Sequence, residues 1–317
     1  MTSTYHTPVL LEASLAGLGL GEDAPARSAE APGRHFVDVT FGGGGHSRAI
    51  LERMGPADRL WGFDQDPDAR AQVPADPRFT LIPQNFRHAR NFLRLNGVSE
   101  VAGLLADLGV SSHQFDEAAR GFSTRFEAPL DMRMNPQAGV SAAELIGGED
   151  VAGLARILAM YGEIPRPMRV AQAMHAAHAA GAIPTTTALV NLIRPFAPPR
   201  KENQFAAQVF QALRMAVNDE LAALQELLMQ CVHSIPEGGR LVVISYHSLE
   251  DRLVKHFMRS GNFEDAPARD LKGRLCVPFS PLGRKAIIAD EAEQLSNPRS
   301  RSARLRVAVR TDWNPAS

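Results

Sequence analysis

The sequence predicts an α/β fold in which an open, mostly parallel sheet is interrupted by a helical insertion. Short apolar runs of strand length alternate with helical patterns from residue 36 to residue 108. For about a hundred residues after that only loop and helical patterns occur, and a further apolar run, 239–245, then resumes the sheet. We expect a sheet domain of residues 1–112 and 203–317, and an inserted helical domain of residues 113–202 on the substrate side.

A cluster of glycines, 42–45, separates the first predicted strand from the first helix. The run 36–39 precedes it, a helical pattern follows at 47–54, and a second run, 60–63, ends at Asp64. Glycine permits positive φ and lets a ligand approach the backbone, and the helix behind the turn begins with unpaired N–H groups. An acid about 20 residues after the glycines commonly accepts hydrogen bonds from a ribose diol. The segment predicts a site for a nucleoside-containing ligand; a plain structural turn is the simpler alternative.

Two residues favour S-adenosylmethionine over a dinucleotide as that ligand. Dinucleotide sites prefer the pattern G-x-G-x-x-G, and here Ser47 stands in place of the third glycine. Asp38, just before the turn, suits the amino group of a nucleoside that carries an amino acid. A pyrophosphate has no comparable use for this acid.

Candidate ligand contacts also follow or end the third and fourth predicted strands. The run 78–83 leads to Phe86, which either stacks on an adenine or belongs to the core. The run 103–108 carries Asp107 at its end. Since ligands bind at the C-terminal edge of a parallel sheet, we expect Asp107 to face the same crevice as Gly44 and Asp64.

The insertion is predicted to consist of helices, and one long helix is predicted to follow it. Helical patterns occur at 142–146, 151–161, 170–180 and 186–193. The long helix, 203–234, should pack an apolar stripe on the sheet. After the fifth strand come Tyr246 and His247, and Ser248 with Asp251 resembles a capping box for the next helix.

Composition narrows the class of protein. The chain has 317 residues, of which 44% are hydrophobic and 22% charged, with a formal net charge of −1. This composition is typical of a soluble globular protein and argues against wholesale coating of nucleic acid. The two cysteines lie in no paired motif, and no signal peptide or membrane-spanning run is recognised, so we expect a cytoplasmic protein. His175 and His178 lack further ligands at metal spacing, and we predict no metal.

Basic residues gather in the C-terminal segment. Residues 265–310 contain ten Lys and Arg against five acids. Such a surplus is either a phosphate-contacting face or a solvated one. We expect Arg299, Arg301, Arg304 and Arg306 to contact phosphates, and the alternation at 304–310 to form a final edge strand.

Eight motifs together resemble one family. They are HTPVLLEASLAGL at residue 6, TFGGGGHS at 40, FDQDP at 63, LLADLGVSSHQFD at 104, RGFS with PLDMRM over 120–134, FQALRMAVNDEL at 210, ISYHSLEDR at 244 and NPRSRSARLR near the end. Over nearly the whole chain the sequence resembles the bacterial 16S ribosomal RNA (cytosine-N4) methyltransferases, S-adenosylmethionine-dependent enzymes with a Rossmann-like class I methyltransferase sheet and an inserted all-helical subdomain.

The resemblance implies the site residues, the cofactor and the partner. Carried over by position, the cofactor contacts are Gly44, Gly45, His46, Asp64, Phe86, Asp107 and Gln114, the last on the resemblance alone. The implied partner is 16S rRNA within the small ribosomal subunit, methylated at a cytidine N4 in the decoding region near the P site. No membrane partner is expected, and monomer and homodimer both remain open.

The chemistry requires acceptors for the target amine, whose lone pair is delocalised into the cytosine ring. Related amino-methyltransferases place a proline-containing turn after the fourth strand, and here that turn is Asp107-Leu108-Gly109-Val110. We expect Asp107, or the carbonyls of Leu108 and Gly109, to accept from the amine, with His247 as the next catalytic candidate and Tyr246 as a stacking partner. The alternatives are a methyltransferase for small molecules and a nucleotide-binding regulatory protein without catalysis.

Overall fold

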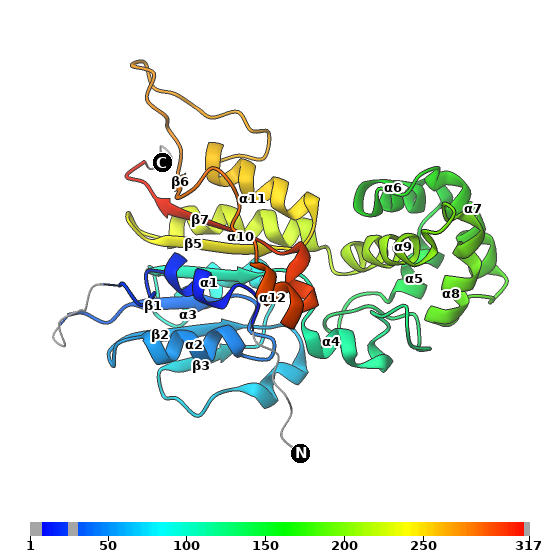
Figure 1. Ribbon diagram of the computed structural model, residues 1–317, viewed down its shortest axis with the longest axis horizontal. Helices are drawn as coiled ribbons and strands as arrows, with labels where there is room; N and C mark the ends of the chain where they lie inside the picture. Colours follow the sequence, from blue (N-terminus) through cyan, green and yellow to red (C-terminus); the bar gives the residue numbers. More distant parts are fainter. Residues whose placement is uncertain (1–7, 25–30, 314–317) are drawn as a thin grey trace. The chain divides into compact units, whose positions relative to one another are not determined.

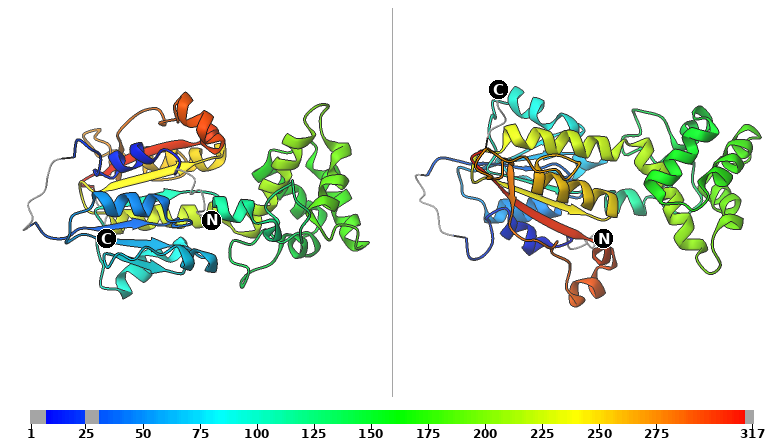
Figure 2. Two further views of the ribbon diagram at one scale, coloured as in Figure 1. Left: turned by 60° about the horizontal axis from the view of Figure 1, so that its bottom comes forward. Right: turned by 90° about the horizontal axis from the view of Figure 1, so that it is seen from above.

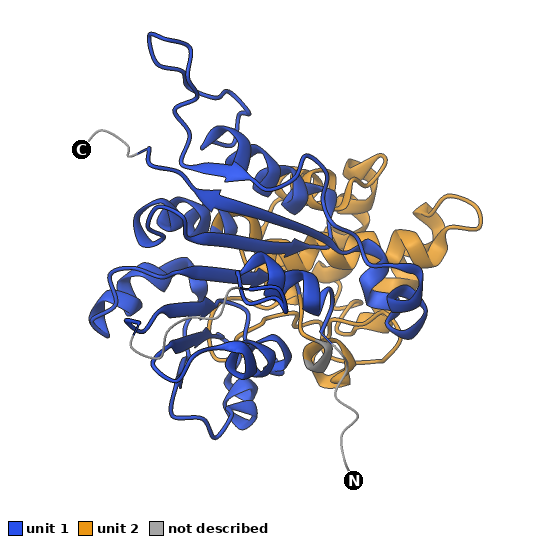
Figure 3. Cartoon of the chain, turned by 60° about the vertical axis from the view of Figure 1, so that its left-hand side comes forward, with its two compact units in different colours: residues 1–109, 223–317 blue, residues 110–222 orange. Residues whose placement is uncertain are grey.

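The computed structural model describes residues 8–24 and 31–313, and the chain divides into two compact units (Figures 1 and 3). Unit 1 comprises residues 1–109 and 223–317, and unit 2 comprises residues 110–222. Unit 2 is longer than the predicted insertion, 113–202, because helix α9 (Glu202–Val217) buries its apolar face in the core of unit 2. Residues 6–7 of the leading motif and 25–30 of the loop before the first strand lie outside the described residues.

Unit 1 is built on a seven-stranded sheet with the order β3-β2-β1-β4-β5-β7-β6 (Figure 1). The strands are β1 (His35–Asp38), β2 (Arg59–Phe63), β3 (Phe79–Ile82), β4 (Gly103–Asp107), β5 (Arg240–Ser245), β6 (Phe279–Pro281) and β7 (Arg304–Arg310). The first five strands are parallel to one another, and β7 is antiparallel to β5 and β6. The strand order reverses between β1 and β4, and open α/β sheets bind ligands at the C-terminal ends of strands at such a reversal.

Helices cover both faces of this sheet, as Figure 2 shows. Successive strand residues point to opposite faces, so Leu104 and Leu105 enter different core clusters. Helices α1 and α2 pack on the face of Leu105, and α3, α10 and α11 pack on the face of Leu104. The helices of unit 1 are α1 (Leu11–Gly17), α2 (Gly45–Arg53), η1 (Pro67–Gln72), η2 (Phe86–His88), α3 (Ala89–Leu95), most of α10 (Glu220–Ser234), α11 (Ser248–Ser260), α12 (Glu291–Ser296) and η5 (Pro298–Ser302). The predicted α/β class is confirmed.

Strand β7 differs from its predicted place at the edge of the sheet. It lies between β5 and β6, with Ile244 opposite Leu305 and Phe279 opposite Arg310. The short strand β6 contains Pro281 and takes the edge position, where a residue without an N–H is tolerated. The alternating pattern of 304–310 predicts the strand itself. It carries no information about the three-residue strand β6 that pairs with it.

Unit 2 is helical and has its own core. Its elements are α4 (Ser112–Asp116), η3 (Ala118–Arg120), α5 (Ala142–Gly148), α6 (Val151–Gly162), α7 (Pro167–Ala179), α8 (Thr186–Ile193), η4 (Arg194–Phe196) and α9. All four helical patterns predicted for the insertion are present. Leu154, Leu158, Met174, Leu189 and Leu213 lie at the centre of the core and are inaccessible to solvent.

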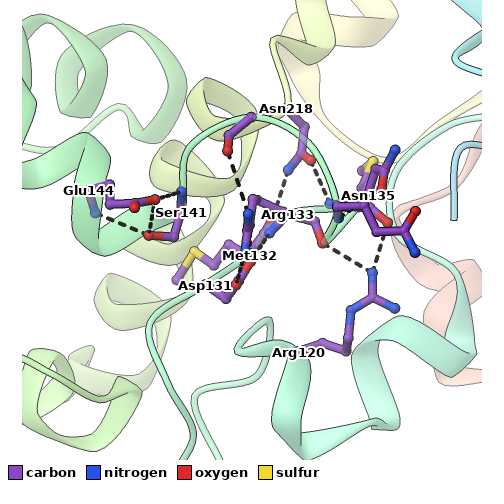
Figure 4. Close-up of polar contacts among 11 residues, drawn as sticks. Arg120, Asp131, Met132, Arg133, Asn135, Ser141, Glu144 and Asn218 are labelled. Atoms are coloured by element: carbon purple, nitrogen blue, oxygen red, sulfur yellow. Dashed lines mark hydrogen bonds and ion pairs between the residues drawn. The ribbon is translucent and has the colours of Figure 1, made fainter.

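A short polar network fixes the segment 131–134 inside unit 2 (Figure 4). Met132 is fully buried and has φ +63°, a conformation that a residue other than glycine seldom adopts. The Asn218 amide donates to the Met132 carbonyl at 2.8 Å and accepts from the Met134 N–H at 2.7 Å. Arg120 donates to the carbonyls of Arg133 and Met134 at 3.1 and 2.8 Å.

This network also explains why the predicted long helix 203–234 is wrong. Two helices, α9 and α10, occupy the range, and the chain turns between them at Asn218 and Asp219. Asn218 caps α9 and holds the 131–134 segment, while Asp219 adopts φ +49°, which a continuous helix does not allow. The apolar stripe is therefore split: Phe210 enters the core of unit 2, and Leu228 packs on the sheet of unit 1.

Candidate active site

A glycine turn joins the end of β1 to the start of α2. Gly44 is the N-cap of α2, with φ +73°, and α2 has no side-chain cap hydrogen bond. A Cβ at Gly44 would lie 2.8 Å from the Phe41 ring, and a Cβ at Gly45 would lie 2.5 Å from Cγ of Pro8. Only glycine fits both places, and the bare backbone leaves a polar ligand free to approach the first N–H groups of α2.

Asp64 follows β2 and is tied directly to that turn. Its Oδ2 accepts a hydrogen bond from the Gly42 N–H at 2.7 Å, and its Oδ1 accepts one from the Asp66 N–H at 2.8 Å. Burial raises the pKa of the Asp64 carboxyl to about 6, against the opposing effect of these hydrogen bonds. Each carboxylate oxygen retains a second lone pair, so Asp64 can still accept from a ribose diol.

Asp107 ends β4, next to β1 in the sheet. Its backbone N–H donates to Oγ1 of Thr40 at 2.6 Å, and its Oδ1 accepts from the Tyr246 hydroxyl at 2.8 Å. Nδ1 of His46 lies 3.7 Å from Oδ2. Burial raises the pKa of Asp107, while the charge of His46 and the hydrogen bond from Tyr246 lower it. Thus Gly44, His46, Asp64 and Asp107 lie at one edge of the sheet, where the strand order reverses.

Asp38 is almost completely buried and bonds to the turn. Its Oδ2 accepts from the Ser47 hydroxyl at 2.7 Å, and its Oδ1 accepts from the Thr40 N–H at 3.2 Å. Burial raises the pKa of this carboxyl as well. Ser47, in the position of the third glycine of a dinucleotide motif, therefore anchors Asp38. The structure gives Asp38 an internal role in addition to the ligand contact that the sequence suggested.

The segment after β5 is capped differently from the prediction. Helix α11 begins at Ser248 with His247 as its N-cap, and Glu250 is the third helical residue. A Glu250 carboxylate oxygen accepts from the N–H groups of Tyr246 and His247 at 3.0 and 3.2 Å. Asp251 instead pairs with Arg306, so the predicted Ser248–Asp251 capping box is wrong. The catalytic role of His247 stays a prediction.

Phe86 and Gln114 complete the set of predicted cofactor contacts. Phe86 opens η2 after β3 and packs, half-buried, against the core cluster of unit 1. Gln114 belongs to unit 2, where its Oε1 accepts from the Ser111 N–H at 3.0 Å. The structure therefore brings together the glycine turn, His46, Asp64 and Asp107 without testing either Phe86 or Gln114 as a ligand contact.

Sequence reasoning missed Thr40 and the hydroxyl of Tyr246 as partners of Asp107. Tyr246 stands 139 positions from Asp107 along the chain, so no local pattern connects them. The one available signal was that Tyr246 follows strand β5, which is parallel to β4 and adjacent to it.

The C-terminal cations fall into two groups. Arg306 donates to both carboxylate oxygens of Asp251 at 2.7 and 3.0 Å, which is at odds with its predicted role as a phosphate contact. Arg310 is buried and donates to backbone carbonyls, among them those of Val232 and Pro278. Arg301 and Arg304, by contrast, are exposed.

Residues 8–24 and 31–313 contain no group of three or more His, Cys, Asp or Glu side chains placed to hold a metal ion. Within the same ranges, no helix is both long enough and apolar enough to span a membrane.

Comparison with known proteins identifies the family. Residues 3–311 match the MraW methylase family. Three relatives are each called ribosomal RNA small subunit methyltransferase H. The one from Parabacteroides distasonis is 50% identical, with 96% of this chain and 97% of the relative covered. The one from Amoebophilus asiaticus is 47% identical, with 98% of this chain and 97% of the relative covered. The one from Cytophaga hutchinsonii is 48% identical, with 96% of this chain and 99% of the relative covered. The resemblance read from the motifs is thereby confirmed, and the chain belongs to the MraW methylase family.

Proposed function

We propose that this protein transfers a methyl group from S-adenosylmethionine to the N4 amine of a cytidine in 16S rRNA of the small ribosomal subunit. The observation that carries the proposal is the position of the Asp107 carboxylate, which ends β4 beside the glycine turn at the reversal of strand order. The names of the relatives, ribosomal RNA small subunit methyltransferase H, support the choice of RNA as substrate.

The residues at the turn fit S-adenosylmethionine. Gly44 and Gly45 lie against Phe41 and Pro8, where a Cβ would clash, and the N-terminus of α2 offers backbone N–H groups. Asp64 provides a carboxylate for the ribose diol, and Phe86 offers a ring for the adenine. When bound, S-adenosylmethionine supplies a methyl group on a positively charged sulfur.

Asp107 is our candidate for the group that prepares the target amine. The N4 lone pair is delocalised into the cytosine ring, so acceptors on the N4 hydrogens are needed to direct it at the methyl carbon. As the nitrogen–carbon bond forms, the carbon–sulfur bond breaks with its electron pair remaining on sulfur, and one N4 proton must leave. The Asp107 carboxylate can accept that proton and release it to water. The Leu108 and Gly109 carbonyls of this turn, and His247 after β5, are the other candidate acceptors.

The direct test is methyl transfer to unmodified small ribosomal subunits, followed by nucleoside mass spectrometry. We expect one new methyl on a cytidine N4. A methyl on carbon 5, on a ribose 2′-oxygen or on a guanine would refute the proposed reaction.

The role of Asp107 is tested by Asp107→Asn, which keeps the shape and one acceptor oxygen but removes the charge. If the carboxylate stabilises positive charge on the attacking nitrogen, kcat should fall about 10²-fold or more, out of proportion to any loss of cofactor affinity. If Asp107→Asn instead weakens cofactor binding and leaves kcat unchanged, Asp107 serves only to bind the cofactor. The acceptor would then be a carbonyl of Leu108 or Gly109, or His247.

A further inference from the structure

Tyr246 is fixed at both ends beside Asp107. Its hydroxyl donates to Oδ1 of Asp107 at 2.8 Å, and its backbone N–H donates to Glu250 at 3.0 Å. Glu250 is itself buried, and the Tyr246 ring packs, half-buried, against the core cluster of α1 and α2. A ring held in this way contributes its hydroxyl to the site. Stacking on a base, as the sequence suggested, would require the ring face instead.

The direction of this hydrogen bond is determined by the chemistry of both partners. Burial raises the pKa of the Tyr246 phenol far above its usual value, and the negative charges of Asp107, Glu250 and Glu293 raise it further. The phenol therefore keeps its proton at neutral pH. A carboxylate can only accept, so Tyr246 acts as a permanent donor to Asp107.

His46 approaches Asp107 from the other side. Its Nε2 lies 3.1 Å from the Val9 carbonyl, and since a carbonyl only accepts, Nε2 carries a hydrogen. Nδ1 faces Oδ2 of Asp107, 3.7 Å away, and the ring carries a positive charge there only when Nδ1 is protonated as well. Asp38 is the other charged group near Asp107, and its negative charge opposes ionisation of Asp107 together with burial. The Tyr246 hydroxyl thus favours the ionised carboxylate, as does His46 when both of its ring nitrogens are protonated, and the buried Asp38 opposes it.

We propose that Tyr246 is a positioning residue for methyl transfer, whose hydroxyl keeps the Asp107 carboxylate ionised and fixes its orientation toward the target amine. The inference rests on the proposed function for its catalytic consequence, but the effect of Tyr246 on Asp107 can be measured without turnover. His46 acts on the same carboxylate only when both of its ring nitrogens are protonated. Asp107 alone would touch the substrate.

The first experiment is a carboxyl ¹³C NMR titration of the full-length protein, with Asp107→Asn used to assign the Asp107 signal. Tyr246→Phe keeps the ring and removes only the donor. We expect the midpoint of Asp107 to rise by about one to two pH units, the size of a lost hydrogen bond to a charged group. Tyr161→Phe, in unit 2, is the matched control and should leave the midpoint unchanged.

A second measurement keeps the inference testable should Tyr246→Phe fail to fold. The chain contains only three tyrosines, so fluorotyrosine can replace all of them with little change of shape. A fluorinated phenol is a stronger donor, and we expect the Asp107 midpoint to fall. A midpoint that stays the same with phenylalanine or with fluorotyrosine would overturn the inference.

Kinetics then separate positioning from a merely structural role. In Tyr246→Phe the acidic limb of the kcat profile should move to higher pH by the same interval as the NMR midpoint, and kcat should recover at high pH. A loss of equal size at every pH would overturn the positioning role. If the NMR midpoint moves but no N4-methylcytidine forms even in the wild type, the proposed function fails, while the effect of Tyr246 on Asp107 stands.

Discussion

At the scale of single residues, we predict that Asp64 makes cofactor binding sensitive to pH. Burial raises the pKa of its carboxyl to about 6, above the ordinary value of 3.8. A ribose diol donates hydrogen bonds, so the ionised form, which prevails above pH 6, is the one that binds. As pH falls below about 6, the ionised fraction falls roughly tenfold per unit, and the affinity should fall with it.

Calorimetric titration with S-adenosylhomocysteine between pH 5 and pH 8 measures this dependence. Asp64→Asn should bind more weakly, by roughly ten- to a hundredfold at neutral pH, and its affinity should no longer change near pH 6. A wild-type affinity that is constant from pH 5 to pH 7 would remove Asp64 from the cofactor site.

The site residues differ in how far the sequence alone could predict them. Asp64 and Asp107 follow from local patterns, because each ends an apolar run and parallel strands end at one edge of the sheet. The hydrogen bond between Tyr246 and Asp107 and the pairing of Asp38 with Ser47 depend on which side chains meet after folding. No spacing rule contains that information.

At the scale of elements, strand β7 and the segments beside it assign different roles to neighbouring arginines. Arg306 pairs with Asp251 of α11, and both side chains are largely buried. Arg304 lies two residues away on β7 and is exposed, as is Arg301 in η5. An arginine whose charge is already paired with a carboxylate inside the protein gains little from contact with a phosphate. An exposed arginine can contact a phosphate and release counterions from RNA.

The contrast between the exposed Arg301 and Arg304 and the paired Arg306 leads to a prediction in which Arg306 serves as the control. Arg301→Gln with Arg304→Gln should weaken RNA binding and lower the slope of log affinity against log salt by about 0.7 per lost phosphate contact, with stability unchanged. Arg306→Gln should lower the thermal stability, because Asp251 loses its partner. It should leave the salt slope unchanged. Salt slopes that are equal in the wild type and the double variant would mean that Arg301 and Arg304 face only solvent.

At the scale of the whole molecule, the sequence predicts a sheet domain and a helical insertion, and the predicted end of the insertion at residue 202 differs from the end of unit 2 at residue 222. The alternation of strands and helices over 36–108 and its absence afterwards reveal the insertion. The end of the insertion is hidden, because the apolar stripes of α9 and α10 look continuous although they enter different cores. The break depends on the bonds between Asn218 and the segment 131–134, more than 80 residues earlier.

Separate cores predict separate unfolding transitions. Unit 2 is one continuous segment, 110–222, with a buried cluster of its own, so we expect this segment to fold cooperatively when expressed alone. Circular dichroism should show a helical spectrum and a sigmoidal melt. In scanning calorimetry of the full chain, the transition that matches the fragment belongs to unit 2, and the remaining transition belongs to unit 1.

Ligand binding then reports which unit holds the cofactor. S-adenosylhomocysteine at about 100 times its Kd should stabilise the folded unit that binds it by about 2.7 kcal/mol. Because Gly44, Asp64 and Asp107 all belong to unit 1, we expect the unit 1 transition to rise and that of the isolated 110–222 fragment to stay where it is. Gln114 belongs to unit 2, and the family resemblance implies that it too contacts the cofactor. If it does, Gln114→Ala should reduce the ligand-induced rise of the unit 1 transition in the full chain. The melt of the fragment should not change. A shift of the fragment on its own, or an unchanged unit 1 transition, would contradict the assignment of the cofactor to the glycine turn.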